Sequence, residues 1–257
     1  MRDAGLEEAI RAAGGVGALA QKIGISQPSV SNWSRVPADR VISVETVTGV
    51  ARAVLRPDLY SAQPSATVDE VDAARAAEYA LLAVLLARAP SADLLARLAR
   101  LRGDASPLGL AHAALAEAAA ATTVERAERE YFDLFIGIGR GELLPYGSYY
   151  LTGFLNERPL ARLRDELARL GIERSENNAE PEDHAAIVCE IMAGIVGGRL
   201  EAPAGADRAL FEQHFAPWLG RFFADLERAE AADLYRRVGA LGRLFISIES
   251  EAFALPS

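Results

Sequence analysis

LFEQHFAPWLGRFFADL, residues 210–226, is a stretch in which large apolar side chains recur every three or four residues. Such spacing places side chains on one face of an α-helix, because the helix turns once in about 3.6 residues. The four-residue series is Leu210, His214, Trp218, Phe222 and Leu226, with Phe211, Phe215, Leu219 and Phe223 beside it. A face this wide must be buried against other helices. The stretch therefore predicts a helix that packs within an all-α bundle.

Further helical stripes lie upstream and downstream of this one, and no strand-like alternation of convincing length appears. They comprise Val124, Ala127, Tyr131, Leu134, Phe135 and Ile138; Leu160, Leu163, Leu167 and Leu170; Ile187, Val188, Ile191, Met192, Ile195 and Val196; and Leu234, Val238, Leu241, Phe245 and Ile248. Helices that each carry one apolar face must bury these faces against one another. We therefore predict an all-α fold.

Composition bounds the class of protein. The chain has 257 residues, of which 51% are hydrophobic and 25% charged, so it is long enough for two globular domains. No apolar run reaches the roughly 18 to 20 residues that a membrane helix needs, and the N-terminus lacks the pattern of a secretory signal. We therefore expect a cytoplasmic protein without membrane insertion.

The net charge of −9 is unevenly distributed. Residues 1–63 hold seven basic and six acidic side chains, 7 − 6 = +1, which leaves −9 − 1 = −10 for the remainder. A surface that binds nucleic acid without sequence preference needs clustered lysine and arginine. The charge excludes this function for the larger part and leaves the N-terminal part as a candidate DNA-binding module.

The best domain boundary lies within residues 56–69, because the polar segment SAQPSAT at 61–67 has no apolar period. We predict a first domain over residues 1–60, a linker over 61–69 and a second domain over 70–257.

The first domain contains the spacing of a helix-turn-helix in GVGALAQKIGISQPSVSNWSR, residues 15–35. Ala20 packs inside the first helix, Gly24 forms the turn, and Ser26 caps the second helix, from which Val30 faces the core. Together with Ile25, with RVPADRV at 35–41 and with RPDLY at 56–60, this pattern resembles the YdaS branch of the Cro-like repressors over residues 6–60.

This resemblance implies that the second helix begins near Gln27 and enters the major groove of DNA. Gln27 and Asn32 would pair with adenine, and Ser31 and Arg35 would contact phosphates. Two half-sites would be read by a homodimer. The near-neutral charge leaves a second interpretation open, in which this domain docks onto another protein. Trp33 fits a core aromatic.

Catalytic and metal sites find little support in the sequence. The one cysteine, Cys189, excludes an internal disulfide and a cysteine-based zinc site, and His112, His184 and His214 lack the spacing of metal ligands. Asp183 beside His184 imitates part of a hydrolase triad, but no serine lies in a nucleophile elbow. We predict no catalytic residue, no metal and no cofactor, and hence a protein that is not an enzyme.

The segment EPEDH, residues 180–184, places three carboxylates directly before an apolar stretch. Pro181 suits the first position of a helix, where Glu182 and Asp183 would compensate the positive end of the helix dipole. His184 shares the phase of the apolar stripe that follows, so we expect it to point inward or along the edge of a groove.

Three motifs occur in order in the second domain: EYFDLFIG at 130–137 with LPYGSYY at 144–150, then EPEDH, and finally FEQHFAPW at 211–218. Their order and spacing in an all-helical domain resemble the TorD/DmsD/NarJ family of redox-enzyme maturation chaperones over residues 70–253. Leu144 stands where the family often has the first of two prolines. The fold implied is a larger TorD-like helical bundle after the small helix-turn-helix domain.

The same resemblance implies a cytoplasmic chaperone that binds the twin-arginine signal peptide, or the apo form, of a molybdenum-cofactor oxidoreductase, assists cofactor loading and proofreads export. Such a receptor needs an apolar groove with carboxylates at one end. The implied binding residues are Leu134, Phe135, Pro145, Tyr146, Ser148, Tyr150, His214 and Trp218, with Glu180, Glu182, Asp183 and His184 at the polar end. Several of these also fit a core or a helix cap, and both interpretations stay open at this point.

Two alternatives use the same residues. The protein would be a one-component transcription regulator if the helical domain senses a peptide or a small ligand on behalf of the DNA-binding domain. The two functions would be joined if peptide binding changed DNA affinity, and such coupling would be reciprocal in free energy.

Overall fold

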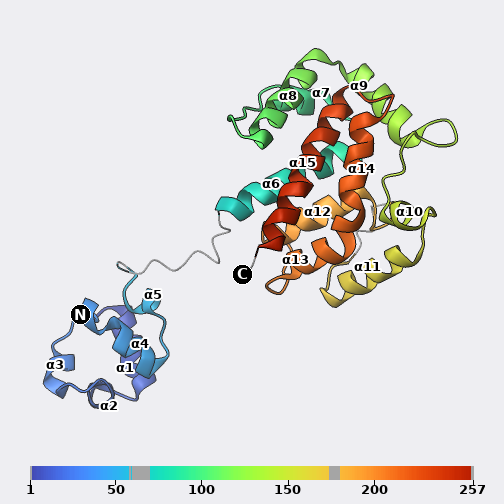
Figure 1. Cartoon of the computed structure of the whole chain (residues 1–257). Coiled ribbons are helices and arrows are strands. Elements are labelled where there is room, and N and C mark those ends of the chain that lie inside the picture. The colour runs from blue at the N-terminus through green and yellow to red at the C-terminus, as the bar shows by residue number, and fades with distance from the viewer. Residues whose placement is uncertain (1, 58, 60–69, 174–179, 256–257) are drawn as a thin grey trace. The chain divides into compact units, whose positions relative to one another are not determined.

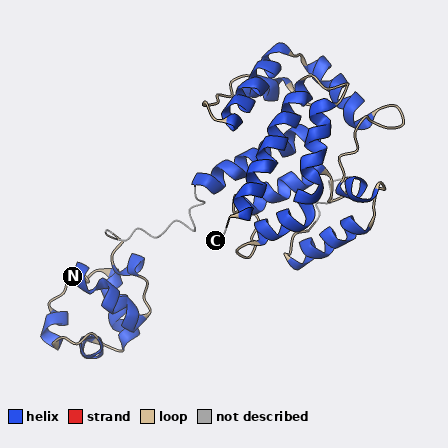
Figure 2. Cartoon of the chain, viewed as in Figure 1, coloured by secondary structure: helices blue, strands red, loops and turns tan. Residues whose placement is uncertain are grey.

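The computed structural model describes residues 2–57, 59, 70–173 and 180–255 (Figure 1). The chain divides into two compact units, Met1–Thr67 and Val68–Ser257. Within the described residues every regular element is a helix, and no strand is present (Figure 2). The predicted all-α fold is confirmed. The predicted linker, 61–69, lies outside the described residues.

The smaller unit consists of short helices around one apolar core. Its elements are α1 (Ala4–Ala13), α2 (Val16–Lys22), α3 (Gln27–Ser31), the 3-10 turn η1 (Ala38–Arg40), α4 (Val41–Thr48) and α5 (Arg52–Leu55). Gly24 lies between α2 and α3 with a φ of +70°, a conformation that favours glycine, and the Ser26 hydroxyl accepts the Ser29 N–H at the start of α3. Ala20 and Val30 are buried, as the helix-turn-helix pattern predicts.

The larger unit is a bundle of longer helices. In chain order these are α6 (Glu70–Ala87), α7 (Ala92–Leu98), α8 (Pro107–Ala121), α9 (Val124–Tyr131), the π-helical turn η2 (Phe132–Ile136), α10 (Gly147–Thr152), α11 (Arg158–Arg169), α12 (Ala185–Val196), α13 (Ala206–Leu210), the π-helical turn η3 (Phe211–Phe215), α14 (Ala216–Arg228) and α15 (Leu234–Ala254). None of the helices in the described part of the chain is long and apolar enough to cross a membrane.

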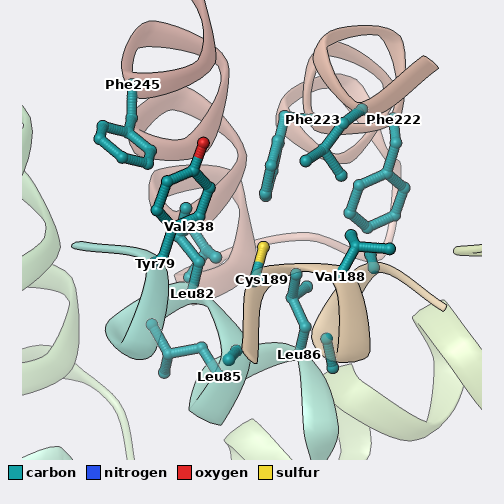
Figure 3. Packing of buried hydrophobic residues seen from close by; sticks show 14 of the residues in the cluster. Tyr79, Leu82, Leu85, Leu86, Val188, Cys189, Phe222, Phe223, Val238 and Phe245 are labelled. Atoms are coloured by element: carbon teal, nitrogen blue, oxygen red, sulfur yellow. The ribbon is translucent and has the colours of Figure 1, made fainter. Parts of the chain in front are cut away.

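Four helices supply most of the centre of this bundle. Side chains of α6, α12, α14 and α15 meet there, among them Tyr79, Cys189, Phe222 and Phe245 (Figure 3). Each large apolar side chain buried in this way stabilises the fold by about 1.5–3 kcal/mol relative to exposure. The Cys189 thiol is fully buried, and burial raises its pKa.

The apolar stretch at 210–226 is not one continuous α-helix. The π-helical turn η3 separates α13 from α14, just before Pro217. Proline has no N–H to donate to the carbonyl four residues earlier, so the regular α-helical ladder cannot run through this point. The wide apolar face still forms, because Leu210, Phe215, Trp218 and Phe222 are all buried.

The predicted stripe at 124–138 ends earlier than expected. The π-helical turn η2 follows α9, and Gly137 then adopts a φ of +63°, which terminates the helix. Ile138 lies beyond this break and is 99% exposed, so its place on the stripe was wrongly predicted.

The EPEDH segment also differs from its prediction. Helix α12 begins at Ala185 and not at Pro181, so Glu182 and Asp183 lie outside its first turn. His184 is the N-cap residue, in an extended conformation, and its Nδ1 accepts the Ala186 N–H at 3.1 Å. Asp183 instead accepts hydrogen bonds from the N–H groups of Gly147 and Ser148, and these tertiary contacts override the local preference for a helix start.

A buried carboxylate joins α9 to the beginning of α15. Glu130 accepts the N–H groups of Asp233 at 2.7 Å, Leu234 at 3.1 Å and Tyr235 at 2.6 Å. The first N–H groups of a helix have no partner within it, so this side chain satisfies donors that the fold would otherwise bury unpaired. Glu130, the first residue of the EYFDLFIG motif, thus has a structural role.

Replacing Glu130 with alanine should lower the free energy of unfolding by about 2 to 4 kcal/mol, because three amides near the start of α15 lose their acceptor. Urea denaturation followed by circular dichroism measures this change. Glu128→Ala, an exposed carboxylate on the same helix, is the matched control and should change stability by less than about 0.5 kcal/mol. Equal effects of the two substitutions would contradict the capping role.

A second prediction concerns His184 and pH. Burial lowers its pKa below the ordinary value of 6.5, although nearby Glu180 and Asp183 oppose the shift. A buried neutral imidazole contributes stability that is complete above about pH 6.5 and is lost as the pH falls below it, because the unfolded chain then binds more protons. The melting temperature should therefore fall on acidification.

His184→Asn keeps a side-chain acceptor for the Ala186 N–H but does not titrate. Between about pH 7.5 and 5.5 its melting temperature should fall less steeply than that of the wild type. Comparison of the two slopes removes the contributions of His112 and His214, which both proteins share. Parallel curves would show that His184 does not couple protonation to folding.

Candidate functional site

Two segments that are distant in sequence are joined side by side in the larger unit. The Gly147 N–H donates to the Asp183 carbonyl at 2.9 Å, and the Ala185 N–H donates to the Pro145 carbonyl at 2.8 Å. Tyr146 and His184 form an isolated antiparallel bridge between these bonds. The LPYGSYY and EPEDH motifs therefore form one structural unit.

The Asp183 side chain strengthens this connection. Its Oδ2 accepts the Ser148 N–H at 2.6 Å, at the beginning of α10. Both residues are buried, with exposed fractions of 3% for Asp183 and 0% for Ser148. Hydrogen bonds to a carboxylate are among the strongest in proteins, and this one holds α10 against the start of α12.

A cavity of about 510 Å³ opens beside this unit, and we call it the motif pocket. Its walls come from the two joined segments, from α10 and α11, and from the FEQHFAPW motif. It is lined by Gly147, Leu151, Thr152, Pro159, Arg162, Leu163, Asp183, Gln213, His214, Pro217 and Trp218. Gly147, Asp183 and Gln213 come from three different motifs and lie 30 or more positions apart in the sequence, yet they line one space.

Trp218 forms a rigid wall of the motif pocket. Its indole Nε1 donates to the His214 carbonyl at 2.9 Å. A Cβ atom at position 147 would lie 2.9 Å from Nε1, so this close approach requires glycine in the LPYGSYY motif. Burial lowers the pKa of His214; Glu166 opposes this shift, and Arg162 and Arg169 add to it.

Asp183 presents an unusual polar group at the motif pocket. Its Oδ1 is buried and has no hydrogen-bond partner among the described residues. A buried carboxylate oxygen without a donor costs free energy, of the order of 1–3 kcal/mol or more. The geometry favours a ligand that brings a hydrogen-bond donor or a positive charge.

Other predicted site residues lie around different cavities. Glu180 and His184 line a second cavity of about 420 Å³ between α6 and α12, where the Tyr146 hydroxyl donates to Glu180 at 2.7 Å. Tyr150 lines a third, of about 440 Å³, and its hydroxyl donates to Asp225 at 3.0 Å. Glu182 forms an ion pair with Arg164 at 2.8 Å.

Two residues that were expected to line an apolar groove are not exposed in the structure. Leu134 is fully buried in the core, and Pro145 is buried where the two motifs join, so neither offers surface to a partner. Phe135 is half-buried and packs against the rings of Tyr131 and Tyr235. Of the predicted residues, Asp183, His214 and Trp218 are brought together at the motif pocket, and the others are not.

The sequence motifs missed one wall of the pocket. This wall is formed by two helices that lie outside the three motifs except at the start of α10: Leu151 and Thr152 belong to α10, and Pro159 and Arg162 belong to α11. Arg162 is exposed between Leu160 and Leu163 on an amphipathic helix, a position that normally indicates a solvated face. Gln213 and Pro217 also line the pocket, and their place within the FEQHFAPW motif is a sequence signal that could have identified them.

In the smaller unit, the predicted DNA-contacting side chains are all exposed. They are Gln27 and Ser31 in α3, Asn32 at its C-cap, and Arg35 beyond it. The Arg2 guanidinium donates to the Ser31 carbonyl at 3.3 Å. Trp33 is half-buried and packs against the core of this unit, as expected.

Comparison with known proteins agrees with the motifs. Residues 101–224 match the family described as nitrate reductase delta subunit, and residues 6–64 match the family described as bacterial toxin YdaS. A chaperone protein TorD of Vibrio cholerae is 32% identical over 126 residues, which cover 46% of this chain and 57% of that protein. TorD of Vibrio atlanticus is 23% identical over 135 residues, covering 49% and 63%. The alignments thus span less than two thirds of these relatives.

A solved structure of a candidate redox enzyme maturation protein from Archaeoglobus fulgidus is 19% identical, with a TM-score of 0.46, and covers 67% of this chain and 93% of that one. The two family matches coincide with the two groups of motifs found in the sequence. The larger unit is therefore similar to the nitrate reductase delta subunit family and to chaperones named TorD over residues 101–224, and the smaller unit is similar to the YdaS family over residues 6–64.

Proposed function

We propose that this protein is a non-catalytic, cytoplasmic maturation chaperone for a molybdenum-cofactor oxidoreductase. It binds the twin-arginine signal peptide, or the apo form, of this client, assists cofactor loading and proofreads export. The observation that carries the proposal is the convergence of three TorD-like motifs on the motif pocket. Similarity to chaperones named TorD supports the general role.

The chemistry of the motif pocket suits an arginine side chain. A guanidinium offers five N–H donors and stacks on flat aromatic or apolar surfaces. Asp183 Oδ1 lacks a donor, and Trp218 and Pro217 supply flat apolar walls. An arginine that entered here would pair with the buried carboxylate while its stem contacts apolar side chains.

The charges around the pocket favour a cationic ligand at its base. Arg162 is exposed at the wall, so solvent and salt screen its repulsion. Asp183 is buried, and its attraction is screened much less. The net charge of the larger part of the chain, −10 by the arithmetic above, also attracts a basic peptide over longer distances.

The proposal predicts that Asp183→Asn weakens binding of a twin-arginine signal peptide to the full chain by about tenfold or more, because the pocket loses its negative charge. Asparagine can still accept the Ser148 N–H, so the connection to α10 is kept. Fluorescence anisotropy of a labelled peptide measures the affinity, and a melting curve checks the fold.

Asp165→Asn is the matched control, since Asp165 is an exposed carboxylate on α11 and does not line the pocket. It should leave the affinity unchanged. A peptide with both arginines replaced by alanine should bind the wild type and Asp183→Asn equally. If Asp183→Asn folds and binds the intact peptide as tightly as the wild type, the motif pocket is not the arginine site.

We further propose that the smaller unit binds DNA, with Gln27 and Asn32 at base edges and Ser31 and Arg35 at phosphates. The exposure of these side chains beside a glycine turn and a serine-capped helix supports this second function. Recognition would use two copies, because one short helix reads few bases. In the alternative, the protein is a transcription regulator whose larger unit senses a ligand.

Replacing Gln27 and Asn32 together with alanine should weaken binding to a duplex from the region upstream of the protein's own gene by about tenfold or more, through lost base contacts. Electrophoretic mobility shifts of the full chain measure this effect. Ser43→Ala, at an exposed position on α4, should not change the affinity. Specific DNA binding without any signal-peptide binding would favour the regulator over the chaperone.

A further inference from the structure

An exposed apolar cluster lies beside the motif pocket, on α10 and the turn that joins it to α11. Leu151 is 41% exposed, Phe154 70% and Leu155 44%. Leu151 also lines the motif pocket, so the cluster and the pocket share a wall. Isolated exposed apolar side chains are ordinary, whereas a contiguous group beside a cavity is typical of a binding surface.

The turn that carries this cluster is held in place. Gly153 has a φ of +84°, and its N–H donates to the Tyr149 carbonyl at 2.7 Å. Asn156 adopts a φ of +59°, which is uncommon for a residue other than glycine. Its N–H donates to Ser148 Oγ at 3.2 Å, so the strained backbone has a fixed partner.

Ser148 connects the turn to the base of the pocket. Its N–H donates to Asp183 Oδ2, its Oγ accepts the Asn156 N–H, and its carbonyl accepts the Thr152 hydroxyl at 2.8 Å. The buried carboxylate and the exposed apolar turn are therefore anchored on one residue. A surface fixed in advance loses little conformational entropy when a ligand binds.

Resting on the proposed function, we infer that Leu151, Phe154 and Leu155 bind the apolar segment that follows the arginine pair of the signal peptide. We infer this ligand from the order in which charged and apolar groups follow one another along the surface. The base of the pocket offers an unpaired buried carboxylate, which suits a cation, and the adjoining wall continues into exposed apolar side chains. A peptide with a cationic group followed by an apolar run matches both parts.

This site differs from the groove that the sequence suggested. Leu134 and Pro145 are buried in the fold and cannot receive a peptide there, whereas Phe154 and Leu155 have apolar area free to be covered. The three motifs then supply the polar end of the site, and the α10–α11 turn supplies its apolar end. Figure 1 shows this turn at the periphery of the larger unit, where a peptide can reach it.

The test compares two labelled peptides and two double variants of the full chain. One peptide has an intact arginine pair and apolar segment, and the other has serine in place of the large apolar residues of that segment. Phe154→Ser with Leu155→Ser removes the apolar surface. Leu110→Ser with Ile138→Ser, at positions 61% and 99% exposed that do not line the pocket, is the matched control.

We expect the Phe154 and Leu155 variant to bind the intact peptide roughly tenfold more weakly than the wild type, because buried apolar area is lost. It should bind the serine peptide as the wild type does, and the control variant should match the wild type with both peptides. Both substituted side chains are exposed, so the melting temperature should be unchanged.

Two other outcomes separate the inference from the proposed function. If the wild type prefers the intact peptide but the Phe154 and Leu155 variant keeps the full preference, the apolar segment binds elsewhere and the inference is wrong while the proposed function stands. If the wild type binds neither peptide, the proposed function fails and the inference falls with it.

Discussion

The hydrogen bond from the Ser148 N–H to Asp183 Oδ2, at 2.6 Å between buried groups, is the contact on which the rest of the site depends. It brings the segment after η2 against the start of α12 and places Gly147 under the Trp218 indole. It also fixes the residue that anchors the α10–α11 turn. One polar contact thus sets the shape of the motif pocket and the position of the apolar surface beside it.

The larger unit uses buried carboxylates repeatedly as connectors between helices. Glu130 holds the start of α15, and Glu249 accepts Arg75 Nε at 2.8 Å and the Tyr79 hydroxyl at 3.0 Å, which joins α6 to α15. A buried carboxylate stabilises a fold only when donors satisfy it. Glu130 has three amides, whereas Asp183 has one oxygen without a partner at a cavity. Because its donors satisfy it, Glu130 has a structural role, whereas the free oxygen of Asp183 makes this residue a candidate binding group.

The sequence predicted the parts that depend on local pattern. Helical periodicity predicted the all-α fold and the apolar stripe of α12, and turn chemistry predicted Gly24 and Ser26 in the smaller unit. Tertiary contacts determined the helix boundaries and the burial of individual side chains, which the sequence pattern did not predict. Asp183 left the helix start to bind Ser148, Pro217 and Gly137 accompany breaks in two helical stripes, and packing buried Leu134. The apolar turn at Phe154 lies outside the sequence motifs. It becomes a candidate binding surface only because the structure places it beside the motif pocket.

Hydrogen–deuterium exchange on the full chain, with and without a twin-arginine signal peptide, tests whether the motif pocket and the α10–α11 turn form one peptide site. We expect slower exchange on peptide binding across residues 147–156 and 213–218, with little change at the centre of α15. A bound peptide that leaves these segments unchanged and instead slows exchange along the cavity between α6 and α12 would contradict this expectation.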